Sequence, residues 1–135
     1  PFRRAQTEFF KTLSFDKDKT VFAVGHICPV QTTLQKGDIF DIERDTYAKW
    51  NAEFERMGIE FMLCAHQHVA HVVLSDDEKN TLPHNYPVIV GTECAFQKEG
   101  AGKLFGTAIR FKKDGTAFAF TDEEKNVKEE FYIGK

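Results

Sequence analysis

The sequence IEFMLCAHQHVAH occupies residues 59–71 and decides the fold that we predict for this chain. Its first seven residues form a short, mainly apolar run, which is typical of a strand buried on both faces of a sheet. His66 and His68 follow at the point where this strand ends, and His71 comes soon after them. The stretch therefore predicts a buried strand with imidazoles at its carboxyl end.

A second apolar run, TVFAVG at residues 20–25, is followed in the same way by His26. It also predicts a strand buried on both faces. Ligands of open α/β sheets collect at the carboxyl ends of the strands. If the two strands are neighbours, we expect His26, His66 and His68 to lie close together.

Helical spacing of apolar residues appears on either side of the first strand. Residues 2–13 predict one amphipathic helix. A second helix is predicted with Asp45 as its N-cap and Gly58 as the residue that ends it. Its apolar face is formed by Tyr47, Trp50, Phe54 and Met57.

The remaining chain predicts further strands and a hairpin-rich C-terminal end. Strands are expected at 69–74, 86–91, 104–111, 116–121 and 131–133, and Lys-Asp-Gly at 113–115 is a hairpin turn signal. Residues 26–40 and 75–85 are expected to be loops. The prediction is one mixed α/β domain over residues 1–135.

Composition narrows the function classes. The chain has 135 residues, of which 41% are hydrophobic and 14 are Phe, so it can bury a core. The net charge of −3 and the scattered Lys and Arg indicate no nucleic-acid patch. No apolar run approaches the length of a membrane span. Three widely spaced cysteines form neither a disulfide framework nor a zinc motif. Localisation stays open.

The histidines are the candidate functional residues. Imidazole is a common ligand of Zn, Mn and Fe, so His26, His66 and His68 are candidate metal ligands. A single histidine after a strand is more often structural, and His-x-His occurs in unrelated folds. His71 and His84 are candidate substrate-binding residues, with an exposed or supporting role as the alternative. No catalytic residue is assigned.

Four segments together resemble the calcineurin-like metallophosphoesterase family. They are KTVFAVGHICPV, IEFMLCAHQHVAH, LPHNYPVIVGTE and QTEFFKTL, and the similarity spans roughly residues 1–95. Ala65 stands where the family usually has Gly, and Cys28 where it commonly has Pro. The resemblance implies that His26 and His66 bind one metal ion and that His68 binds another.

The resemblance also implies a fold and an activity. The fold would be part of a four-layer α/β/β/α sandwich with a mixed sheet. The activity would be hydrolysis of a phosphomonoester or phosphodiester, in a small molecule or a phosphoprotein, at two divalent ions (Mn, Fe or Zn).

Three other motifs of the family are expected upstream of this chain. No Asp-x-His occurs in it, and the Gly-Asp-x-x-Asp letters at 37–41 lie after His26, in a predicted loop. We therefore expect the chain to be the C-terminal half of a catalytic domain, inactive alone. Exposed strand edges would favour self-association. The alternatives are a non-catalytic metal- or anion-binding α/β module and an unrelated α/β domain with structural histidines.

Overall fold

The computed structural model describes residues 2–27, 44–65, 70–77, 82–91, 104–122 and 124–134. The chain divides into two compact units, each described by itself. The first unit consists of Pro1–His66 and Val72–Ile89, and the second consists of Gln67–His71 and Val90–Lys135. The elements are α1 (Phe2–Thr12), β1 (Phe22–Val24), α2 (Arg44–Arg56), β2 (Phe61–Cys64), β3 (His71–Val73), β4 (Val88–Val90), β5 (Leu104–Lys112), β6 (Gly115–Asp122) and β7 (Val127–Gly134). This content of helices and two sheets confirms an α/β fold.

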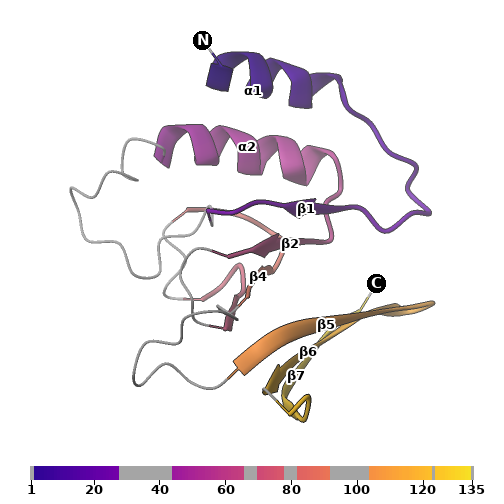
Figure 1. Cartoon of the computed structure of the whole chain (residues 1–135). Helices are drawn as coiled ribbons and strands as arrows, with labels where there is room; N and C mark the ends of the chain where they lie inside the picture. Colours follow the sequence, from indigo (N-terminus) through magenta and orange to yellow (C-terminus); the bar gives the residue numbers. More distant parts are fainter. Residues whose placement is uncertain are drawn as a thin grey trace. The chain divides into compact units, whose positions relative to one another are not determined.

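The first sheet has the strand order β1-β2-β4-β3. β1 and β2 are parallel neighbours, with Phe22 opposite Phe61 and Val24 opposite Leu63. The two histidine-bearing strands are therefore neighbours, which is the condition that the expected clustering of their histidines requires. Figure 1 shows α1 and α2 on the same side of β1, β2 and β4.

The end of α2 sets the path of the chain into β2. Gly58 has φ +73°, a conformation that glycine adopts without a Cβ penalty. The amide of Gly58 donates to the Glu55 carbonyl, and the amide of Ile59 donates to the Phe54 carbonyl. These two bonds form a Schellman ending, which confirms the predicted role of Gly58. The predicted N-cap is wrong, because α2 begins at Arg44 and so already includes Asp45.

α1 is held against α2 by aromatic and polar contacts. Phe10 packs edge-on against Trp50, with 5.5 Å between ring centroids. The Trp50 indole donates a 3.0 Å hydrogen bond to Thr7. The Arg56 guanidinium donates to the carbonyls of Phe10 and Leu13, which satisfies two acceptors at the end of α1.

Burial differs sharply between the two histidine-bearing strands. Phe61 in β2 is fully buried, and β4 is buried throughout, as expected for central strands. β1 is at the edge of the described sheet, with Val24 73% exposed and Phe22 40% exposed. The prediction that β1 is buried on both faces is therefore wrong for this structure, because Phe22 and Val24 share one face of the strand and that face is exposed.

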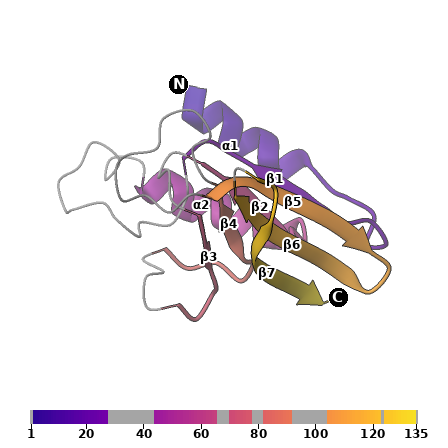
Figure 2. The ribbon, with the colours of Figure 1, turned by 60° about the horizontal axis from the view of Figure 1, so that its bottom comes forward.

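The second sheet is antiparallel, in the order β5-β6-β7 (Figure 2). Lys112 pairs with Gly115, which leaves a two-residue turn at 113–114 and confirms the predicted hairpin. β6 also pairs with β7 along 115–121, so the last strand is longer than the predicted 131–133. Thr116, Phe118 and Phe120 supply buried side chains of the central strand β6.

One aspartate organises the turn between β6 and β7. The Asp122 carboxylate accepts hydrogen bonds from the amides of Glu124 and Asn126 and from the Lys128 ammonium. Partial burial alone raises the pKa of Asp122, but these donors outweigh it and lower the pKa to about 2. Lys125 adopts φ 66° in this turn.

None of the helices in the described ranges is long and apolar enough to cross a membrane.

Candidate functional site

The carboxyl ends of β1 and β2 meet at one edge of the first sheet. The Gly25 amide donates a 2.9 Å hydrogen bond to the Leu63 carbonyl. One step further, the Ala65 amide donates a 3.0 Å hydrogen bond to the His26 carbonyl. The parallel ladder thus continues past both strands, and it holds His26 beside the residue that directly precedes His66 in the chain.

Of the three predicted metal ligands, only His26 lies within the described residues. His26 follows β1 with an exposed side chain, as a ligand at a sheet edge requires. His66 and His68 lie outside the described residues. Within the ranges that the structure describes, no group of three or more His, Cys, Asp or Glu side chains could hold a metal ion. His26 is therefore described with an exposed side chain, and all three ligand assignments stay predictions.

The two candidate substrate-binding histidines have different surroundings. His71 begins β3 and is half-buried. In the sheet order, β2 and β4 lie between β3 and β1. His71 is therefore not on a strand that neighbours β1, the strand that His26 follows. His84 is buried, with only 4% of its surface exposed. This burial favours a structural role for His84 over contact with a substrate.

His84 belongs to a buried polar cluster beneath α2. Its Nδ1 lies 2.6 Å from the Tyr86 carbonyl, which can only accept, so Nδ1 carries the proton. The Tyr86 hydroxyl donates a 2.6 Å hydrogen bond to the Asn51 side chain, and Asn51 donates to the Pro83 carbonyl. Burial raises the pKa of Tyr86, so its hydroxyl stays protonated as this bond requires.

Acidification is expected to destabilise the first unit through His84. Burial lowers the pKa of His84 below 6.5, although the Tyr86 carbonyl and the Glu55 carboxylate oppose that shift. As the pH falls below about 6.5, the unfolded chain binds a proton that the folded protein does not, so stability decreases. Urea unfolding at about pH 7.5 and about pH 5.5 measures this loss. His84→Phe should be less stable at both values but less dependent on pH. An equal pH dependence in both proteins would contradict this role.

A pocket of about 290 Å³ lies beside His26, between the two helices and the end of β1. Four aromatic side chains line it, Phe10 from α1 and Tyr47, Trp50 and Phe54 from α2, together with the aliphatic side chains of Val24, Ile27 and Met62. Gln6 and His26 supply polar side chains. The sequence pattern places the α2 aromatics on one apolar helix face and predicts no pocket there. The i, i+3, i+7 spacing was the available signal, but it does not distinguish a packed face from a pocket wall.

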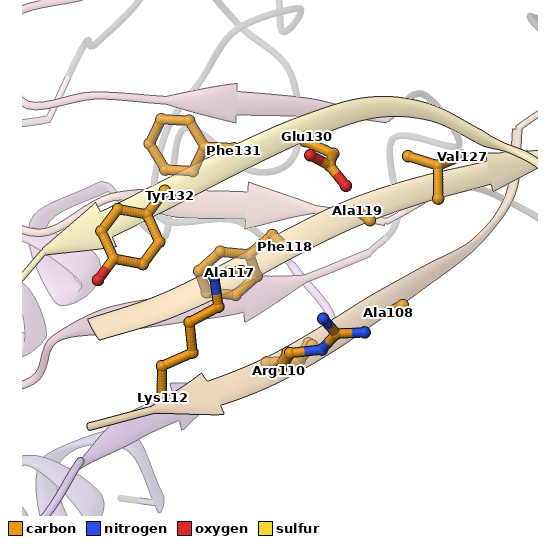
Figure 3. A pocket seen from close by; sticks show the side chains of 11 residues that line it. Ala108, Arg110, Lys112, Ala117, Phe118, Ala119, Val127, Glu130, Phe131 and Tyr132 are labelled. Atoms are coloured by element: carbon orange, nitrogen blue, oxygen red, sulfur yellow. The ribbon is translucent and has the colours of Figure 1, made fainter. Parts of the chain in front are cut away.

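A second concavity, of about 410 Å³, lies on the β5–β6–β7 sheet (Figure 3). Arg110, Ala117 and Tyr132 are cross-strand neighbours there. The Lys112 ammonium lies 5.3 Å from the centre of the Tyr132 ring. The lining mixes Arg110 and Lys112 with Glu130, and it includes no histidine or cysteine among the described residues. This surface therefore offers less to metal chemistry than the His26 edge.

Comparisons with known proteins include a distant structural likeness. No family model matches the sequence, and no curated protein matches it. Among solved structures, the chain resembles a conserved uncharacterized protein, a predicted phosphoesterase, from Streptococcus pneumoniae TIGR4. The sequences are 15% identical and the TM-score is 0.46. The match covers 72% of this chain and 53% of that one, so this chain spans about half of that structure. This likeness is too distant to place any residue of the site.

Proposed function

We propose that this chain takes part in metal-dependent hydrolysis of a phosphate ester, with His26, His66 and His68 as metal ligands. The observation that carries the proposal is the hydrogen bond from the Ala65 amide to the His26 carbonyl. It brings the residue before His66 beside His26, which is the backbone arrangement needed for two strands to share one site. The assignment of His66 and His68 rests on their positions in the sequence.

In the proposed reaction, the protein and the bound metal ions have different roles. Two divalent ions, when bound, lower the pKa of a coordinated water and neutralise charge on the phosphoryl oxygens. The chain supplies neutral imidazoles, which hold such ions without adding negative charge. Carboxylates that complete the set would come from outside residues 1–135, in a four-layer sandwich to which this chain contributes the C-terminal half. The chain alone should bind metal weakly and hydrolyse little.

Replacing His26 with alanine is expected to weaken metal binding more than about tenfold, a loss at least as large as that from removing a supporting residue of a metal site. The fold should be unaffected, because the His26 side chain is exposed. Paramagnetic broadening of backbone amide resonances near residues 26 and 65 by Mn²⁺ measures even weak binding. His71→Ala is the matched histidine control and should broaden like the unmodified chain. Unchanged broadening in His26→Ala would contradict the assignment.

A non-catalytic metal- or anion-binding module is the second candidate. It needs no carboxylates from another segment, and the exposed side chain of His26 at the end of β1 is compatible with it. The two candidates separate in a protein that joins this chain to the carboxylate-bearing segments that the hydrolase proposal requires. The hydrolase predicts Mn²⁺-dependent cleavage of a phosphate ester that His26→Ala abolishes. The binding module predicts metal uptake with no cleavage to lose.

A further inference from the structure

We propose that the pocket between α1, α2 and the end of β1 binds a planar aromatic group, such as a nucleobase or an aryl ring, of the phosphate ester. The substrate assignment rests on the proposed function, whereas binding of the aromatic group rests on the pocket alone. Position, lining and size of the pocket each contribute to the inference.

The wall of the pocket is suited to an aromatic ring. Trp50 packs edge-on against both Phe10 and Tyr47, with ring centroids 5.5 and 5.6 Å apart. Its indole N–H is already donated to Thr7, which fixes the orientation of the ring. Rings held in this way present faces and edges to a further ring at little conformational cost. A flat aromatic guest therefore gains more binding free energy from contact with these rings than an aliphatic chain of equal area.

The described lining of the pocket favours a neutral guest over a charged one. None of the described lining residues is Lys, Arg, Asp or Glu. The Gln6 carboxamide lines the pocket and forms no hydrogen bond with the other described residues. A carboxamide both donates and accepts, so it can pair with the polar edge of a nucleobase. The pocket thus suits a neutral ring with polar edge atoms and not a phosphate or a charged peptide side chain.

The size of the pocket limits the guest to one ring system. Its volume of about 290 Å³ is at the lower end of the range, roughly 300–1,000 Å³, that holds drug-sized ligands. A single base or aryl group fits such a space, and a whole dinucleotide does not.

The location of the pocket connects it to the proposed reaction. His26 is both a wall residue of the pocket and the described candidate metal ligand. A phosphate held at the His26 edge would therefore carry its ester group directly into the pocket. This makes the pocket a determinant of substrate choice, separate from the groups that would act on phosphorus.

Trp50 reports directly on the pocket, because it is the only tryptophan in the chain. We would titrate the 135-residue chain with AMP, adenosine, phenyl phosphate and ribose 5-phosphate, and follow Trp50 fluorescence. Stacking of a base on aromatic side chains predicts binding of AMP about tenfold tighter than ribose 5-phosphate, which lacks the base. Adenosine should also change Trp50 fluorescence, because the pocket binds the ring and not the phosphate. Phenyl phosphate separates an aryl preference from a nucleobase preference.

Gln6→Phe fills the pocket from α1 and should weaken AMP binding about tenfold or more. Arg4→Phe adds the same ring at an exposed position of α1 that does not line the pocket, and it should leave binding unchanged. Circular dichroism checks that both variants fold. Equal binding of AMP and ribose 5-phosphate, or unchanged AMP binding in Gln6→Phe, would overturn the proposal. Binding of adenosine in a protein that cleaves no phosphate ester would instead uphold the pocket and refute the proposed function.

Discussion

Gly115→Ala is expected to destabilise the β5–β6–β7 sheet by about 3 kcal/mol. Gly115 has φ +156°, a conformation that residues with a Cβ rarely adopt. A Cβ at this position would also collide with the main-chain carbonyl of Ile133 and lie 2.6 Å from the Tyr132 hydroxyl. The carbonyl belongs to the neighbouring strand β7, so relief of the collision requires the sheet to open.

Hydrogen exchange of peptides from residues 115–134 measures this effect within the second unit. Gly134→Ala is the matched control, because Gly134 is the direct cross-strand partner of Gly115. A Cβ at Gly134 meets only an ordinary contact, 3.8 Å from the Tyr132 ring. We expect faster exchange across both strands in Gly115→Ala and nearly unchanged exchange in Gly134→Ala. Equal protection in the two variants would show that the backbone at Gly115 is not strained by a side chain.

Phe61→Ala is expected to lower the free energy of unfolding of the first unit by about 3–5 kcal/mol. The Phe61 side chain is completely buried at the start of β2. It stacks on Phe22 of β1, with ring centroids 5.0 Å apart and planes at 8°. Removing the ring leaves a cavity between the two strands whose ends carry the candidate site, and the surrounding residues cannot fully collapse into it.

Urea unfolding followed by Trp50 fluorescence measures the loss, because Trp50 is in α2 of the same unit. Phe22→Ala is the control that removes the other member of the stacked pair. Since Phe22 is 40% exposed, its removal should cost only about 1 kcal/mol. If Phe61→Ala and Phe22→Ala lower the free energy of unfolding by similar amounts, the buried ring of β2 does not contribute more to stability than the half-exposed ring of β1.

The placement of His26 could be predicted from sequence because it depends on local patterns. An apolar run of strand length followed by a histidine appears twice, and parallel pairing brings the ends of such runs to one edge. Gly58 was predictable for a similar reason, since a helix ending in the left-handed conformation favours glycine. The position of each histidine after its strand and the glycine that ends α2 require no knowledge of distant contacts, whereas the pairing of β1 with β2 joins residues far apart in the sequence.

Other features depend on tertiary partners that the sequence pattern does not identify. The run TVFAVG resembles a buried strand, yet β1 is at the edge of the described sheet, because burial is decided by neighbours. His84 occurs in a polar stretch, yet its Nδ1 bond to Tyr86 allows it to be buried. The aromatic pocket needs α1 and α2 together, and helical periodicity describes each helix separately.

The bond between Ala65 and His26 joins two main-chain groups, so it does not depend on the side chain at position 26. Exchange of that imidazole for a carboxylate or a thiolate would therefore leave the two strand ends in register. Under the proposed function, single substitutions would change the metal preference of this edge without moving the backbone that positions the ligands. For protein engineering, position 26 is thus a point at which donor chemistry can be varied independently of folding.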